Sequence, residues 1–292
     1  MKFQFIISKW ANFYFFVSNL SEWHFSARKN YNLTWKEGFG GLSTEEENAL
    51  NKFKEFRQGY NSGKTFFEEA FFTTKNPFDI LQKNLPESEY QIIKQVFNIL
   101  EKKFDILYDK DLSLMKEWRK KLINEMSDYS MDRIINILEK LYNTSTPKKE
   151  INIYILFSAS QQTGGGSNIN DKSITIELSH YPLEKINHIL GIIWHEVIHL
   201  IYQDNFYKLL LIYSLADQKV ADFINELVAT SLFPKGILGI RLLNANPAIK
   251  LLSQITETQT INIINLTKIY IDQNESFDND FIKKLDIIIK NH

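Results

Sequence analysis

The chain has 292 residues, of which 44% are hydrophobic and 14% aromatic, and its 34 basic and 35 acidic side chains give a net charge of −1. This length and composition allow one large domain or two modest ones with a full apolar core. The balanced charge argues against nucleic acid as a partner, and the lack of cysteine excludes disulfides and cysteine-held zinc.

The first residues show no clear targeting signal. The apolar stretch that begins at Phe3 is too short for a signal peptide and is broken by Lys9. No apolar run approaches the roughly 18 residues of a membrane span. We therefore expect a cytoplasmic protein without a membrane span. An aromatic cluster follows, which favours core packing, with a substrate pocket as the alternative: Trp10, Phe13, Phe15, Phe16 and Trp23.

Residues 1–148 are expected to form a helical N-terminal region. Ser43 and Glu46 form a capping-box pattern, which opens a helix. Pro86 opens another, and apolar residues then recur at helical spacing. The expected helices span about 43–60, 86–107, 112–126 and 131–142. This half of the chain offers no chemistry of its own.

Two strands are expected next. Residues 151–157 are rich in β-branched and aromatic side chains, and residues 173–179 alternate cleanly, with Ile174, Ile176 and Leu178 on one face. The connecting residues 159–172 contain three consecutive glycines. They lack the lysine and hydroxyl ending of a phosphate loop, so we expect a flexible flap or hairpin tip.

The most informative pattern is His195-Glu196-Val197-Ile198-His199, inside an apolar run. Residues four apart share one face of a helix, so both imidazoles would point the same way at a spacing that can hold one zinc ion. Glu196 is placed to act as general base on a water at the metal. The alternative is a histidine pair satisfied within the core, which would leave no role for a metal.

Zinc would need a third protein ligand. The spacing of metzincins fails, because Tyr202 and Asn205 stand where that class has glycine and histidine. His180 and His188 lie upstream, at spacings that argue for neither.

A downstream carboxylate is the better candidate. Glu226 lies in an apolar stripe of helical period that Pro234 ends, whereas Glu257 and Glu275 lie in polar stretches. We expect Glu226 to be the ligand, with an ordinary surface glutamate as the alternative. After Pro234, helices are expected near residues 247–257, 260–272 and 277–290.

His195-Glu196-x-x-His199 together with Asn225-Glu226-x-x-Ala229 resembles the gluzincin metallopeptidases, and in style their compact members, the minigluzincins. The resemblance covers about residues 150 to 235. It implies His195, His199 and Glu226 as zinc ligands and Glu196 as general base and acid. Thermolysin-like members carry an aspartate one turn after the ligand glutamate, where this chain has Thr230. Asp222 or Asn225 is the candidate for that supporting role.

The order of elements fits a zincin fold, so the expected class is α+β and mostly helical, with residues 149–292 as a zincin-like metallopeptidase domain ending in helices. In that fold the strand before the active-site helix is an edge strand, which can pair with an extended peptide. The expected substrate-binding residues are therefore Ser173, Ile174, Thr175, Ile176, Glu177, Leu178 and Ser179.

We therefore expect a zinc-dependent metallopeptidase that acts on a peptide or protein substrate. The alternatives are a catalytically silent binding or regulatory protein of the same fold and a regulatory peptidase of narrow specificity. The donor that stabilises the oxyanion stays open among Tyr181, Tyr207, Tyr213, Tyr270 and His180.

Overall fold

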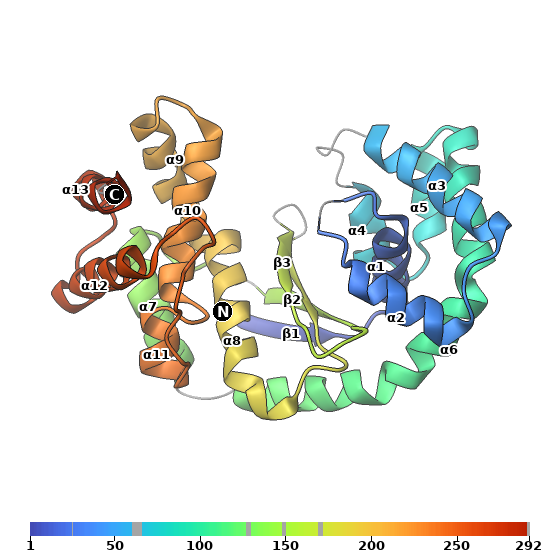
Figure 1. Cartoon of the computed structure of the whole chain (residues 1–292), viewed down its shortest axis with the longest axis horizontal. Coiled ribbons are helices and arrows are strands. Elements are labelled where there is room, and N and C mark those ends of the chain that lie inside the picture. Colours follow the sequence, from blue (N-terminus) through green and yellow to red (C-terminus); the bar gives the residue numbers. More distant parts are fainter. Residues whose placement is uncertain (25, 60–65, 127–129, 148–149, 169–171, 291–292) are drawn as a thin grey trace.

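The computed structural model describes residues 1–24, 26–59, 66–126, 130–147, 150–168 and 172–290. Within these residues the fold is mostly helical with one small mixed sheet of four strands, which confirms the expected α+β class. The helices within residues 9–84 lie on one side of the sheet, and the helices from residue 130 onward lie on the other (Figure 1). The expected domain boundary at residues 148 and 149 lies outside the described residues.

The first half begins with a strand that the sequence analysis did not predict, β1 (Lys2–Ile6). The helices that follow are α1 (Lys9–Ser21), α2 (Lys29–Phe39), α3 (Thr44–Gly59), α4 (Phe66–Thr73) and α5 (Pro77–Asn84). The capping box before α3 is confirmed, since the backbone N–H of Ser43 donates to Glu46 at 2.6 Å and that of Glu46 donates to the Ser43 hydroxyl at 3.3 Å. The expected end of this helix at Tyr60 falls outside the described residues.

A single helix of 39 residues, α6 (Glu87–Glu125), replaces the two helices expected over 86–107 and 112–126. The prediction of two helices was wrong because the polar residues between them contain no helix breaker. One of these residues, Asp111, is buried, and its carboxylate accepts a hydrogen bond from the Ser179 hydroxyl at 2.7 Å. Helix α7 (Ser130–Tyr142) follows, as expected.

The sheet has the strand order β1-β2-β4-β3. Strand β2 (Glu150–Leu156) pairs in parallel with β1 and with β4 (Ser173–Glu177), and β3 (Gly165–Asn168) pairs antiparallel with β4. Ile153, Ile155, Ile174 and Ile176 are all fully buried, so one face of the sheet forms part of the core.

The expectation that residues 173–179 form the edge strand was wrong. Strand β4 is an inner strand, and the edge is β3, within the segment that we expected to be a flap. Glycine explains the difference, because a Cβ atom on Gly165 would lie only 2.7 Å from Cγ2 of Ile192. Without a side chain, this backbone packs against the helix that follows the sheet.

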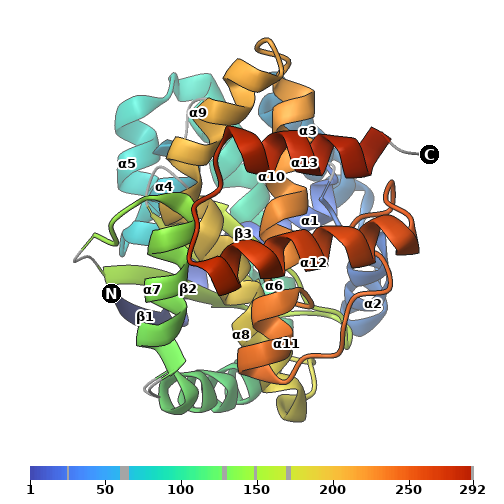
Figure 2. The ribbon, with the colours of Figure 1, turned by 90° about the vertical axis from the view of Figure 1, so that its left-hand side faces the viewer.

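The second half begins with a short 3₁₀ turn, η1 (Leu183–Lys185), which leads into α8 (Ile186–Val197) and a π-helical turn, η2 (Ile198–Tyr202). The helices that follow are α9 (Gln203–Tyr213), α10 (Gln218–Leu232), α11 (Ile237–Leu243), α12 (Glu257–Gln273) and α13 (Asn279–Lys290). Helix α12 packs on α10, and α13 packs on α9 and α12 (Figure 2).

Two details of this half differ from the sequence analysis. Helix α11 was not predicted, and residues 247–256 are not helical. Thr256 instead caps α12 in a capping box with Gln259. Helices α12 and α13 lie close to the expected positions.

One segment, Gln218–Leu243, is long and apolar enough to cross a membrane by length and composition alone. In the fold, 67% of its most apolar window is buried against other elements, and the segment consists of two separate helices, α10 and α11. It is packed as core helices are.

Candidate metal centre

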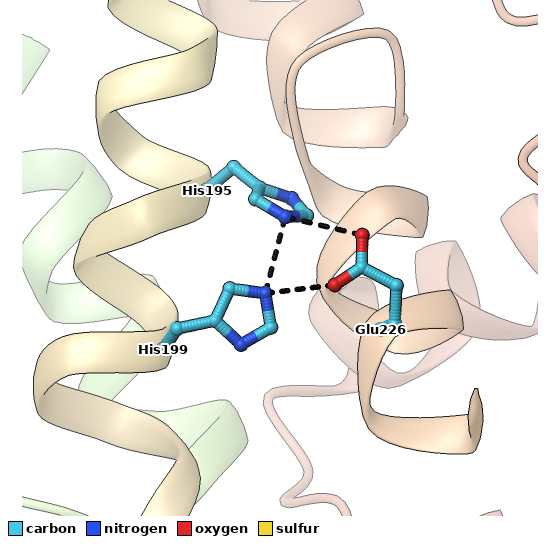
Figure 3. A group of neighbouring side chains, drawn as sticks. All are labelled: His195, His199 and Glu226. Atoms are coloured by element: carbon cyan, nitrogen blue, oxygen red, sulfur yellow. Dashed lines mark hydrogen bonds and ion pairs between the residues drawn. The ribbon is translucent and has the colours of Figure 1, made fainter. Parts of the chain in front are cut away.

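Three elements bring the three expected ligands together (Figure 3). Helix α8 and the turn η2 carry His195 and His199, and α10 carries Glu226 on the facing side. The two imidazole Nε2 atoms lie 3.1 Å apart, and the Glu226 carboxylate oxygens lie 3.4 Å from Nε2 of His195 and 3.1 Å from Nε2 of His199. The ligand atoms of all three lie within 4.8 Å of one another.

These separations suit zinc. Zinc bound at about 2.0–2.1 Å in tetrahedral geometry places its ligand atoms roughly 3.3 Å apart. The side chains of His195 and His199 are only 12% and 14% exposed, whereas that of Glu226 is 46% exposed. The fold therefore encloses the two histidine side chains, whereas the side of the site formed by Glu226 is open to solvent.

The hydrogen bonds of the Nδ1 atoms set the tautomer of both histidines. Nδ1 of His195 lies 3.2 Å from the carbonyl oxygen of Phe233, and Nδ1 of His199 lies 2.7 Å from Oε1 of Gln203. Both partners are acceptors, so each Nδ1 carries the proton and each Nε2 keeps its lone pair. Two lone pairs that face each other at 3.1 Å repel unless a cation lies between them.

Close helix packing places the Phe233 carbonyl. A Cβ atom on Gly191 of α8 would lie 2.7 Å from Cβ and 2.8 Å from Cα of Pro234. Only glycine lets α8 approach the end of α10 so closely. Pro234 ends α10 as expected, and the preceding carbonyl reaches His195.

Asp222 and Asn225, the two candidates for a residue that supports the metal ligands, lie in different surroundings. Asn225 is buried, and its Nδ2 donates to Oε1 of Gln203 at 2.5 Å, so it holds the partner of His199. Asp222 is exposed and accepts a hydrogen bond from Tyr207. Among the described residues it forms no hydrogen bond with either histidine. Thr230 donates to Oε1 of Glu226 at 3.3 Å, so it contacts the glutamate rather than a histidine.

Glu196 lies beside the three ligands and under the edge strand. A Cβ atom on Gly165 would lie 3.1 Å from Oε1 of Glu196, and the Ser167 side chain forms a hydrogen bond with the Glu196 carboxylate. Burial raises the pKa of Glu196 above its ordinary value, although the charges of His195 and His199 act in the opposite direction. A buried carboxylate with a raised pKa is suited to accept and return a proton.

The pKa of Glu226 is shifted in the opposite direction from that of Glu196. Burial alone would raise the pKa of its carboxyl. When His195 and His199 are protonated on both ring nitrogens, as they can be without a bound metal, their Nε2 atoms donate to this carboxylate, outweigh the effect of burial and hold its pKa below the ordinary value. The carboxylates of Glu226 and Glu196 therefore differ in how readily they bind a proton. Glu226 stays ionised as a ligand does, whereas Glu196 holds a proton more readily.

Of the expected substrate-binding residues, 173–177 form the inner strand β4, and Leu178 and Ser179 follow it directly. Ile174, Ile176 and Leu178 are fully buried core residues. The Glu177 carboxylate accepts hydrogen bonds from Arg28 at 2.7 Å and from Tyr31 at 2.8 Å, and the Ser179 hydroxyl donates to Asp111. These contacts hold the strand within the fold, and the free edge belongs to β3.

The other ligand candidates and oxyanion donors lie apart from the three ligands. His180 lies 3.1 Å from Asp111, Tyr213 donates to Asp286, and Tyr270 donates to Asp280. Among the described residues, none of these three side chains forms a hydrogen bond or ion pair with His195, His199 or Glu226. The same holds for Tyr207, which donates to Asp222, and for Tyr181 and His188, whose rings lie 6.0 Å apart.

Three supporting groups were missed by the sequence analysis: Gln203, the Phe233 carbonyl and Ser167. Gln203 follows His199 by four residues, so helical spacing was a usable signal for it. The other two come from long-range packing and left no local signal. No protein-family model matches the chain, and no curated protein or solved structure matches it either.

Proposed function

We propose that this chain is a zinc-dependent peptidase in which His195, His199 and Glu226 hold the metal and Glu196 is the general base. One observation carries the proposal. Two imidazoles, both protonated at Nδ1, direct their Nε2 atoms at each other and at the Glu226 carboxylate, within 4.8 Å and beside the half-buried carboxylate of Glu196. Two histidines and a glutamate are one of the ligand sets of catalytic zinc, and a neighbouring carboxylate can act as the base on its water.

The arrangement of elements supports a zincin-like core of the gluzincin type. A small sheet with an antiparallel edge strand precedes the helix that carries both histidines, and a later helix supplies the glutamate. The pairing of sequence motifs, His195-Glu196-x-x-His199 with Asn225-Glu226, supports the same family. We therefore include a gluzincin-type core in the proposed function.

The residues of the chain have distinct roles in the proposed reaction. Bound zinc would polarise the scissile carbonyl and lower the pKa of a water. Glu196 accepts the proton from the attacking water and delivers it to the leaving amine. Strand β3 replaces residues 173–179 as the substrate-binding edge, because its free edge lies beside Glu196 and can pair with an extended peptide.

Metal content tests the proposal first. The wild-type chain, purified without a metal-binding tag, should hold about one zinc per chain, and His199→Ala and Glu226→Ala should lose it or bind it far more weakly. Glu196→Gln should keep zinc and lose nearly all hydrolysis of a mixed peptide library. If no chain takes up zinc on titration, the metal site is refuted. If only Glu226→Ala binds zinc normally, the third ligand is another residue.

The same measurements separate the enzyme from a silent binding protein of this fold. Zinc in both the wild type and Glu196→Gln, with no cleavage by either, would favour the binding protein or a peptidase of narrow specificity. The burial of Glu196 beside Ser167 favours the enzyme, because a binding protein has no chemical need for a carboxylate there.

A further inference from the structure

A cavity of about 400 Å³ shares strand β3 with the candidate metal centre. Gly165 and Ser167 approach Glu196, and both also line the cavity, on the side where α1 and α4 cover the sheet. In Figure 1 these helices and α8 lie on opposite sides of β3. The volume falls within the roughly 300–1,000 Å³ of small-ligand pockets.

Aromatic rings dominate the walls of this cavity. Tyr14 and Phe15 come from α1, Trp23 from the segment after α1, and Phe72 from α4. The rings of Phe72 and Tyr14 lie 6.2 Å apart in an edge-to-face arrangement, which fixes their position. Such walls favour a flat, apolar group that can stack or pack edge to face.

Two side chains that line the cavity each carry a buried polar atom without a hydrogen-bond partner among the described residues. Nε1 of Trp23 and Oγ of Ser18 are buried, and neither has a hydrogen-bond partner among the residues that the structure describes. Both residues line the cavity. An indole N–H can only donate, so a group that satisfies it must carry a hydrogen-bond acceptor, such as a hydroxyl oxygen.

The charges at the cavity cancel. Nε of Arg28 lies 2.7 Å from Oε2 of Glu177, which also accepts the hydroxyl of Tyr31. A charged ligand would lose its hydration and find no unpaired counter-charge in this pair. The ligand that fits is therefore uncharged.

We propose that this cavity binds an aromatic side chain with a hydroxyl, such as that of tyrosine, and is a specificity subsite of the peptidase. The proposal rests on the proposed function in one respect: the side chain belongs to a peptide whose main chain lies along β3. Gly165 and Gly166 face opposite sides of that strand, toward Glu196 and toward Thr175, and Thr175 lines the cavity. A peptide beside β3 would alternate its side chains in the same way.

A binding measurement that needs no turnover tests this subsite. The ¹⁵N-labelled full chain is titrated with p-cresol, the side-chain analogue of tyrosine, and with n-butylamine and propionate as charged analogues. The indole N–H signal of Trp23 is assigned with Trp23→Phe. We expect p-cresol to shift this signal saturably and the two charged analogues to leave it unchanged.

Two variants locate the binding. Ala27 lines the cavity, so Ala27→Phe should fill it and weaken p-cresol binding at least tenfold, whereas Leu33→Phe on the exposed face of α2 should not. Ser18→Ala removes the hydroxyl without adding bulk to the cavity, and it should weaken binding severalfold even if Ala27→Phe does not fold. No saturable shift in the wild type, or a shift unchanged in the folded Ala27 and Ser18 variants, would overturn the subsite. Either result leaves zinc content and Glu196→Gln hydrolysis unaffected, so the two proposals fail separately.

Discussion

Oε1 of Gln203 lies 2.7 Å from Nδ1 of His199, one helical turn after the histidine. The same oxygen accepts a hydrogen bond from Asn225 on the neighbouring helix α10. The tautomer of a proposed zinc ligand is therefore fixed by a residue from each of two helices.

Gln203→Leu removes this acceptor and should weaken zinc binding about 10- to 100-fold, as is usual for partners of metal-bound histidines. Gln203→Glu keeps an acceptor and should retain affinity within a few fold. Competition with a chelator measures both. The control is Gln273→Leu at the exposed end of α12. Equal affinities for Gln203→Leu and wild type would show that His199 needs no such partner.

Gly191→Ala places a methyl group against Pro234, where the backbone Cα lies 2.8 Å from the added atom. The overpacked contact should lower the free energy of unfolding by about 1–3 kcal/mol. It should also weaken zinc binding, because the Phe233 carbonyl that holds His195 moves with Pro234. Chemical denaturation and chelator competition give the two readouts. Gly59→Ala, with nothing within 4 Å of the added atom, serves as the control, and a loss of similar size there would contradict the close-packing argument.

The decrease of kcat/KM at acidic pH should reflect the protonation of Glu196. The base works only when ionised, and burial raises its pKa, so kcat/KM should fall with decreasing pH at a value above the ordinary glutamate pKa of about 4.3. The Ser167 hydrogen bond favours the ionised form and lowers this pKa. Ser167→Ala should therefore move the acid limb to higher pH, and the exposed Ser253→Ala should not. A shift to lower pH would mean that the Ser167 hydroxyl does not stabilise the carboxylate.

Asp111→Ala removes a buried acceptor shared by Ser179 and His180. The groups left behind should cost about 1–3 kcal/mol in the free energy of unfolding. Asp109→Ala, exposed on the same helix, should stay within about 0.5 kcal/mol of the wild type. Urea titration compares them. Equal stability of the two variants would show that the buried carboxylate contributes nothing to the fold.

Local patterns predicted much of this molecule. Helical spacing placed His195 and His199 on one face, and an apolar stripe placed Glu226 on a helix that packs against them. The alternation of residues 173–179 correctly predicted a strand. These features depend on residues within two or three turns of one another, where sequence pattern is informative.

Contacts between residues that lie far apart in the chain could not be predicted from local sequence patterns. Strand β1 is held in place by its pairing with β2, which lies about half the chain away. No local pattern in residues 2–6 indicates this pairing. Strand β3 consists of residues that favour turns, and only contact with Ile192 and Glu196 makes its glycines suitable. The Phe233 carbonyl is a backbone group, so no side-chain pattern identifies it. The supporting groups of the site are harder to predict than its ligands for this reason.

Helix α6 contacts α1, α2, α3 and α5 along one part of its length and β1, β2 and α8 along another. At 1.5 Å per residue its 39 residues measure roughly 58 Å along the helix, which curves from the side of α3 and α5 to run beneath the sheet (Figure 1). Near its far end, the Trp118 indole donates to the carbonyl of Tyr181, just before α8. Helix α1, which forms one wall of the aromatic cavity, and α8, which carries His195, therefore both pack against α6. The fold therefore sets the distance between the cavity and the metal centre, and in the proposed peptidase this distance would determine which peptides reach both.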